Sequence, residues 1–314
     1  MNQHQHPAAY RVGNATVTKI PEVELTSFSL QTLLPDLTKT DLEHLRSIDP
    51  TDVLVPEDET AILSVHTWLV RTPKHTILVD TGIGNHKHRP TAPIFHQLQS
   101  SYLDRLSAAG VETDMVDYVL LTHIHADHVG WNTRLDEEAN WIPTFPNATY
   151  VFSALERRYA ESLNTDPGRA DGILVDAHLG NPVRRPLQGP YHDSVAPVVE
   201  AGRALLIDVD GSEVLEGVTF LPTAGHSIDH AAIVFRSSGE EAIFGGDVLH
   251  HPAEIYQPEL TSMFCEFPAA SRLSRRRLLD RAAETGATYF SSHFSSTSDG
   301  RISRRGSNFE WRYL

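Results

Sequence analysis

The chain has 314 residues, with 26 Lys+Arg against 41 Asp+Glu, which gives a formal net charge of −15 at pH 7. A chain this acidic repels phosphate backbones, so its composition argues against a nucleic-acid partner. Hydrophobic residues make up 40% and charged residues 21% of the chain, which is typical of a globular protein and excludes the disordered and fibrous classes.

The chain starts without features of an export or membrane segment. Residues 1–7 contain no basic stretch followed by an apolar one, and nowhere do about 18 apolar residues run without interruption. We therefore expect a cytoplasmic protein with no membrane partner. The single cysteine, Cys265, cannot form an internal disulfide, and we expect it to be a small buried thiol.

Short apolar runs rich in β-branched residues, each bounded by Gly, Pro, Asp or Ser, predict buried strands. They span residues 64–70, 76–79, 118–121, 149–152, 218–221, 233–235, 242–244 and 288–290. Apolar residues at three- and four-residue spacing predict helices over residues 94–109, 154–163 and 269–284. Strands and helices mixed along the whole chain predict a layered α/β sandwich.

Two stretches lack a clean period. Residues 22–59 are polar and marked by prolines, with one short predicted helix over residues 39–47. Residues 164–197 are rich in Pro, Gly and Asp and predict a long excursion over the surface, beside the active site. We expect a single domain over residues 1–314, with an N-terminal extension over about 1–60 and this surface excursion over about 164–197.

Other sequence patterns predict a solvent-exposed helix face or exclude particular enzyme classes. Four arginines on the last predicted helix are expected to form a solvated face: Arg272, Arg275, Arg276 and Arg277. The chain contains no GxSxG elbow, no GxxxxGK[ST] phosphate loop and no GxGxxG fingerprint. Serine hydrolases and nucleotide enzymes therefore lack support.

Four potential metal ligands fall within six residues, directly after the predicted strand at 118–121. They are His123, His125, Asp127 and His128. In an extended or turning segment positions i and i+2 point to the same side, so His123 and His125 can share one ion. Asp127 and His128 then fall where the chain turns, aimed at a second point.

Three further candidates repeat one placement, a strand end followed by a small residue and then a ligand. They are His226, Asp247 and His293. Because the C-terminal ends of strands converge on one edge of a layered sheet, these loops can meet although they lie far apart in the sequence. Five His and two Asp suit two ions of the zinc, manganese or cobalt type, and a carboxylate can bridge two ions because it has two oxygens.

This HxHxDH motif, with the three later ligands, resembles the metallo-β-lactamase superfamily from about Ser64 to the C-terminus. The resemblance implies a four-layer αβ/βα sandwich with a metal site at one edge. It also implies that His123, His125 and His226 hold a first ion, that Asp127, His128 and His293 hold a second, and that Asp247 bridges them. Asp80 matches an early Asp of the superfamily, which supports the site by hydrogen bonding rather than by ligating metal.

Details of the motifs narrow the reaction that the resemblance implies. Asp247 stands where true β-lactamases carry Cys, and the diiron flavoproteins have Glu at the second ligand position, so antibiotic hydrolysis and oxygen reduction are disfavoured. Residues 246–252 look closer to the methyl parathion hydrolase-like enzymes than to the acyl-homoserine lactonases, which usually carry Tyr where this chain has His250. The first group includes many lactone and aryl-ester hydrolases.

We therefore expect a dinuclear metal-dependent hydrolase that cleaves an ester or a lactone, acyl-homoserine lactones included, by a hydroxide bridging two divalent ions. Zn²⁺ is the metal expected first, with Mn²⁺ or Co²⁺ as alternatives. Asp127 or Asp247 would accept the proton, and His250 would orient the substrate or protonate the leaving group. An organophosphate phosphotriester or phosphodiester hydrolase of the methyl parathion hydrolase type is the second hypothesis, and a mononuclear iron oxygenase is the third. The expected partner is a small-molecule substrate, and the resemblance is compatible with a homodimer.

Overall fold

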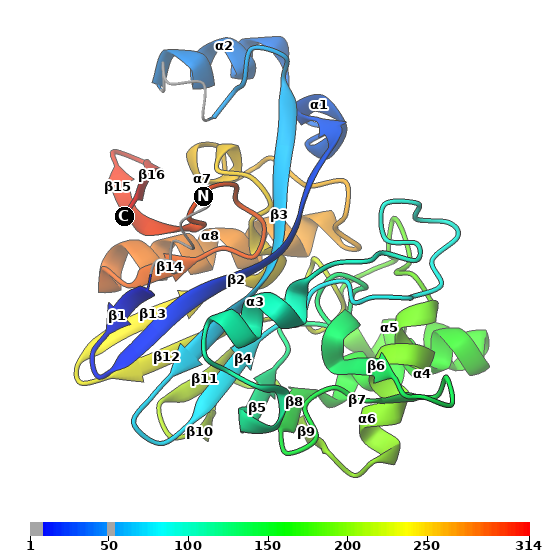
Figure 1. The fold of residues 1–314 in the computed structure, drawn as a ribbon. Coiled ribbons are helices and arrows are strands. Elements are labelled where there is room, and N and C mark those ends of the chain that lie inside the picture. The colour runs from blue at the N-terminus through cyan, green and yellow to red at the C-terminus, as the bar shows by residue number, and fades with distance from the viewer. Residues whose placement is uncertain (1–8, 49–53) are drawn as a thin grey trace.

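The computed structural model describes residues 9–48 and 54–314, and within them the chain forms two seven-stranded sheets and a two-stranded ribbon (Figure 1). Residues 1–7, on which the expectation about an export segment rests, lie outside the described residues. No helix of the described residues is both long and apolar enough to cross a bilayer.

The first sheet has the order β1-β2-β3-β4-β5-β8-β9. Its strands are β1 (Ala9–Val12), β2 (Ala15–Ser29), β3 (Thr60–Arg71), β4 (Thr76–Val79), β5 (Tyr118–Leu120), β8 (Thr149–Ser153) and β9 (Ala204–Ile207). The last four run parallel, so their C-terminal ends share one edge. Residues 9–29, placed by the sequence in an N-terminal extension, form β1 and β2, and β2 pairs with β3 along most of its length.

The second sheet has the order β10-β11-β12-β13-β14-β15-β16. Its strands are β10 (Glu213–Leu215), β11 (Val218–Pro222), β12 (Ala231–Ser237), β13 (Glu240–Phe244), β14 (Thr288–Phe290), β15 (Asp299–Arg305) and β16 (Asn308–Tyr313). β11 and β13 both pair antiparallel with β12, and β14 runs parallel to β13. The C-terminal ends of β11, β13 and β14 therefore lie at one edge.

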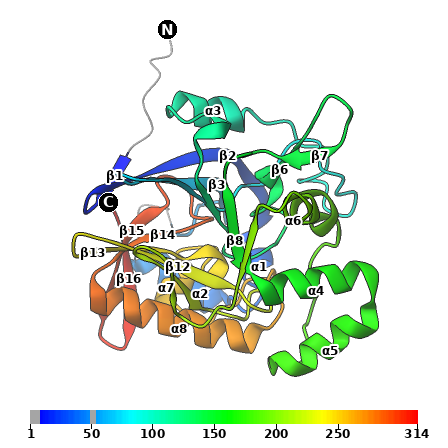
Figure 2. The same ribbon diagram turned by 90° about the horizontal axis from the view of Figure 1, so that it is seen from below.

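Eight α-helices lie around the two sheets in the described part of the chain (Figures 1 and 2). They are α1 (Leu30–Leu33), α2 (Lys39–Ile48), α3 (Tyr102–Ala108), α4 (Ala154–Thr165), α5 (Pro167–Ala177), α6 (Ala196–Glu200), α7 (Ala253–Tyr256) and α8 (Pro268–Thr285). The ribbon is β6 (Thr133–Leu135) with β7 (Trp141–Pro143). Three 3-10 turns are η1 (Thr113–Met115), η2 (Gly130–Asn132) and η4 (Gly246–Val248), and η3 (Tyr191–Val195) is a short π-helix. Figure 2 shows α3 and α8 on opposite outer faces with the two sheets stacked between them, which confirms the expected four-layer sandwich.

Side chains alternate between the layers along β3. Trp68 packs between the sheets against the rings of Phe244 and Phe290, with ring centres 6.4 and 4.9 Å away. Leu69 points to the opposite face, into the cluster that contains Tyr102 of α3. Successive side chains of a strand face opposite sides, so an apolar run on both faces is what a strand buried between two layers requires. Burying one such large side chain contributes roughly 1.5–3 kcal/mol.

Every predicted strand is present, and so are the predicted helices at 154–163 and 269–284, as α4 and α8. The helix predicted over residues 94–109 is wrong in its first half, because only α3 is helical. Backbone groups of the earlier part bond elsewhere: the N–H of Gln97 donates to the carbonyl of Lys87, and that of Ser100 donates to the Asn85 side chain. These bonds fold residues 85–100 into a loop.

The excursion at 164–197 is more ordered than its composition indicated. It contains α5 and η3 as well as irregular chain. Buried Arg89 forms a two-pronged ion pair with Asp193 of η3, at 2.6 and 2.7 Å, which anchors the end of the excursion. The expectation that the arginines of α8 all face solvent is also wrong, because Arg275 is completely buried.

Candidate metal centre

The HxHxDH segment follows β5 at the edge where the parallel strands of the first sheet end. The backbone N–H of Thr122 donates to Asp80 Oδ1 at 2.8 Å, and the N–H of Ala231 donates to the carbonyl of Thr122 at 2.9 Å. These bonds join the start of the segment to both sheets. The turn that follows carries His123, His125, Asp127 and His128 to the junction between the sheets.

The three later candidates reach the same place from the second sheet. His226 follows β11, Asp247 lies in η4 after β13, and His293 follows β14. All seven expected ligands fall into overlapping groups whose nitrogen and oxygen atoms lie within 4.8 Å of one another in each group. The groups are His123/His125/His226, His123/His128/Asp247, Asp127/His128/His293 and His226/Asp247/His250.

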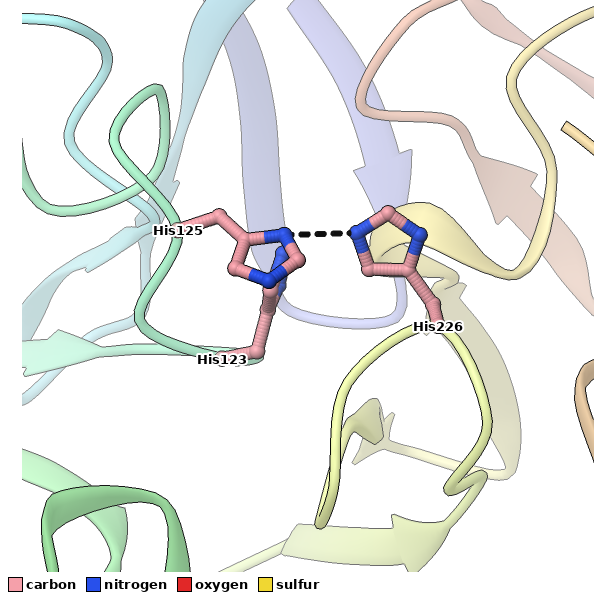
Figure 3. Close-up of side chains that lie close together, drawn as sticks. All are labelled: His123, His125 and His226. Carbon is pink, nitrogen blue, oxygen red and sulfur yellow. Dashed lines mark hydrogen bonds between the residues drawn. The ribbon is translucent and has the colours of Figure 1, made fainter. Parts of the chain in front are cut away.

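The first group is shown in Figure 3. The imidazoles of His123, His125 and His226 point toward one another from the two sides of the junction. His226 Nε2 lies 2.8 Å from His125 Nδ1. Three imidazole nitrogens facing one point form a donor set that could hold a divalent ion of the zinc type.

Asp247 stands between two sets of histidines, with one oxygen toward each. Its Oδ1 lies 3.0 Å from Nε2 of His128 and 3.0 Å from Nε2 of His293. Its Oδ2 lies 3.2 Å from Nε2 of His226 and 4.0 Å from Nε2 of His123. One carboxylate therefore faces two separate nitrogen sets.

Five of the seven ligand candidates are buried, whereas His125 and Asp127 are half-buried, and several ligand atoms make no regular hydrogen bond. Nε2 of His123, Nε2 of His128 and Oδ1 of Asp247 make no hydrogen bond of acceptable geometry to any described residue. Buried polar atoms without partners are costly in a folded protein, by about 1–3 kcal/mol each. Divalent cations of the zinc type would satisfy these lone pairs, so the donor set fits the metal that its chemistry suggests.

Several histidines of this ligand cluster, which comprises the seven ligand candidates and His250, differ in the direction of their pKa shifts. Burial lowers the pKa of His123 and of His226 well below the ordinary value, so both are neutral and free to donate a lone pair. Burial also acts to lower the pKa of His128, but the carboxylates of Asp247 and Asp80 outweigh it and raise that pKa well above the ordinary value. Burial opposes ionisation of Asp247, yet the surrounding imidazoles hold its pKa well below the usual range.

Asp80 supports the cluster from behind, as the sequence analysis expected. Its Oδ2 lies 2.9 Å from His128 Nδ1, and it also accepts the hydroxyl of Thr122. A carboxylate on Nδ1 fixes the ring so that Nε2 faces the metal position. The backbone at Asp80 is left-handed, with φ of 56°, a conformation that Asp tolerates better than most residues.

Two contributors were missed by sequence reasoning. Glu266 is buried, and its Oε1 lies 3.0 Å from His125 Nε2, which leaves Nδ1 of that ring for the cluster. His230 is buried with Nε2 accepting the backbone N–H of Asp247 at 2.9 Å, and burial lowers its pKa to about 3. Gly246 lets this ring approach, since a Cβ there would lie 2.4 Å from His230 Nε2. Glu266 and His230 lie outside the HxHxDH motif and do not follow directly on a strand, so the sequence analysis did not single them out.

The family model described as the metallo-beta-lactamase superfamily matches residues 61–293, which include every ligand candidate. The chain belongs to the metallo-beta-lactamase superfamily. This confirms the resemblance inferred from the motif.

Two curated relatives are named as probable metallo-hydrolases. Rv2300c of Mycobacterium tuberculosis is 27% identical over 206 residues, 60% of this chain and 58% of its own. YqjP of Bacillus subtilis is 26% identical over 157 residues, 46% of this chain and 44% of its own. The matched region therefore spans about half the length of these relatives.

Solved structures share the fold over nearly the whole chain. The hydrolase AbOPH superposes with a TM-score of 0.77 at 22% identity, covering 100% of this chain and 99% of its own. AidC, described as a dizinc quorum-quenching lactonase, superposes with a TM-score of 0.72 at 19% identity, covering 98% and 96%. At these identities the likeness establishes the fold.

His250 lies in the cluster, where the sequence analysis placed it. Its Nε2 lies 3.2 Å from Asp247 Oδ2, and its ring is parallel to that of His293, with centres 5.4 Å apart. The backbone N–H of His250 donates to Glu254 Oε2 at 2.6 Å. This bond fixes the backbone of His250, and its side chain lines a cavity next to the cluster.

That cavity has a volume of about 380 Å³ and opens onto the cluster. Its wall is largely apolar and comes from β2, β3, the 91–95 loop, the excursion and the 264–266 segment: Leu25, Phe28, Leu63, Pro93, Ile94, Phe95, Pro186, Leu187 and Phe264. Several of its polar side chains belong to the ligand cluster or contact it, among them Asp127, Asp247, His250 and Glu266. An apolar chamber with a few convergent polar groups is typical of a small-molecule site.

Proposed function

We propose that the protein is a dinuclear metal-dependent hydrolase that cleaves an ester or lactone bond. The observation that carries the proposal is the position of Asp247, whose two oxygens face different sets of imidazoles. A carboxylate placed in this way suits a bridge between two ions and would be superfluous for one ion held by three histidines.

The proposed ligands divide as the motif implies. His123, His125 and His226 would hold one ion, Asp127, His128 and His293 the other, and Asp247 would contact both. Imidazole and carboxylate ligands favour Zn²⁺, with Mn²⁺ or Co²⁺ as alternatives. When bound, such a pair of ions makes hydroxide available near neutral pH and polarises the bond under attack.

The chain's own groups would bind the substrate and move the proton. Asp127 lines the cavity and is only half-buried, so its carboxylate is placed to accept the proton released during attack. His250 faces the same space, and its ring nitrogens make no hydrogen bond of acceptable geometry to the described residues. It would orient the substrate oxygen or protonate the leaving group, and the apolar wall would exclude water around the acyl part.

An acyl substrate fits the cavity better than a compact charged one. The wall above the cluster is lined mainly by aliphatic and aromatic side chains, which gain free energy by covering an acyl chain. The structural neighbour AidC is described as a lactonase, which favours the same class of bond.

A substrate panel on the metal-loaded protein tests the proposal. Acyl lactones, including acyl-homoserine lactones, aryl esters and paraoxon-like triesters are compared by kcat/KM, with the chelated protein as the blank. We expect hydrolysis of a lactone or aryl ester that is lost on chelation. A triester as the best substrate would replace the proposal with a phosphotriesterase, and full activity with a single iron would contradict both.

A further inference from the structure

The excursion places one cation in the wall of the cavity, Arg184. The backbone N–H of Val183 donates to the carbonyl of Glu266 at 2.9 Å, and Arg184 Nη1 donates to the carbonyl of Met263 at 2.9 Å. Both bonds join the excursion to the 263–266 segment, and the Glu266 side chain of that segment contacts the ligand candidate His125. These two bonds therefore hold the excursion against the site and fix the position of Arg184 in the cavity wall.

Aromatic rings set the position of Arg184 relative to the cluster. Its guanidinium carbon lies 5.5 Å from the ring centre of Phe264. The same ring lies 5.8 Å from the imidazole of His250. The Phe264 ring therefore neighbours both the Arg184 guanidinium and the imidazole of His250 at the cluster.

The guanidinium has spare donors. It carries five N–H groups, and the described residues show one bond to a backbone carbonyl and no ion pair with Asp or Glu. Two other arginines, by contrast, form ion pairs: Arg185 with Asp171, and Arg89 with Asp193. Among the described residues that line the cavity, Arg184 is the one permanent cation.

We propose that Arg184 selects substrates whose acyl part ends in a carboxylate, so that the substrate class is the monoester of a dicarboxylic acid with an apolar linker. This inference rests on the proposed function. The ester bond lies at the cluster, the linker covers Phe264, and the far carboxylate accepts two N–H bonds from the guanidinium. Arg matches a carboxylate with two parallel bonds, which a neutral chain end cannot accept.

The test uses two aryl esters of equal chain length that differ at the far end. They are the mono-4-nitrophenyl ester of adipic acid and 4-nitrophenyl hexanoate. We expect the metal-loaded protein to prefer the acid, and Arg184→Gln to lower the ratio of the two kcat/KM values by about 10- to 100-fold. Arg184→Lys should restore part of the ratio, because it returns the charge without the two-pronged geometry.

Arg185→Gln is the matched control, since this neighbouring arginine pairs with Asp171 and does not line the cavity. It should leave the ratio unchanged. A second readout needs no turnover or metal: adipic acid monoamide and hexanamide are titrated into metal-free protein by calorimetry. The acid should bind more tightly, and Arg184→Gln should remove that difference.

The outcomes separate the two proposals. If neither ester nor lactone is cleaved, the proposed function fails, and calorimetry still decides the role of Arg184. If hexanoate is cleaved and the acid has no advantage, the inference is overturned while the proposed function stands. A fall in both rates for Arg184→Gln with an unchanged ratio also overturns it, and assigns Arg184 to tethering the excursion.

Discussion

Arg275 of α8 and Glu254 of α7 form a completely buried ion pair, with Nη2 2.7 Å from Oε1. The other carboxylate oxygen accepts the backbone N–H groups of His250 and His251, at 2.6 and 3.1 Å. Arg275 also donates to the carbonyl of Val248 at 3.0 Å. The pair therefore secures the loop that runs from Asp247 to His250 beside the proposed metal site.

Removing the arginine should leave the Glu254 carboxylate buried without its counter-charge. We expect Arg275→Ala to lower the free energy of unfolding by about 3–5 kcal/mol, measured by urea denaturation. Arg277→Ala, an exposed position on the same helix, should change it by about 0.5 kcal/mol or less. Equal stability of the two variants would show that the buried pair is not needed.

Asp247 and Asp80 are expected to differ in metal binding. Asp247→Asn keeps the size of the side chain but removes the charge that faces both nitrogen sets, so metal content should fall steeply while far-UV circular dichroism stays unchanged. Asp80→Asn should weaken metal affinity by about 10–100-fold, because Asp80 acts through the His128 ring. A loaded Asp247→Asn beside an empty Asp80→Asn would reverse the two roles.

Glu266 should tune the same site through His125. We expect Glu266→Gln to weaken metal affinity by about 10–100-fold in a chelator competition, since an amide no longer stabilises the orientation of the His125 ring as a carboxylate does. The control is Glu137→Gln at an exposed position. Identical affinities for the two variants would leave Glu266 without this role.

Lys87 gives stability a pH dependence. Its Nζ is buried, donates to Thr133 and to the carbonyl of Asp193, and lies 3.6 Å from the ring centre of Trp141. Burial lowers its pKa to about 7 from 10.5. Between these two values the unfolded chain binds more protons than the folded one, so this group makes stability rise with pH.

The matching measurement compares wild type with Lys87→Met in urea from about pH 7 to about pH 9. The unfolding free energy of the wild type should rise relative to the variant by at most about 1.4 kcal/mol per pH unit. Parallel pH profiles would mean that the Lys87 ammonium keeps its ordinary pKa in the fold.

Sequence patterns predicted the features that a short stretch of chain encodes, namely the buried strands and the ligands that follow their ends. Buried strands appear as apolar runs, and ligands at strand ends gather because parallel strands end at one edge, as with Asp247 and His293. The polar strands of the C-terminal hairpin, β15 and β16, gave no such run and were not predicted. Long-range partners were also out of reach: nothing near Arg275 in the sequence points to Glu254, which lies 21 positions earlier.

Metal stoichiometry tests the central claim most directly. Purified protein is stripped with a chelator, titrated with Zn²⁺, and its bound metal is counted by elemental analysis while hydrolysis of the best ester or lactone is followed. The account predicts that activity reaches its maximum close to two ions per chain, because Asp247 faces two nitrogen sets. Full activity at one tightly held ion per chain would contradict it.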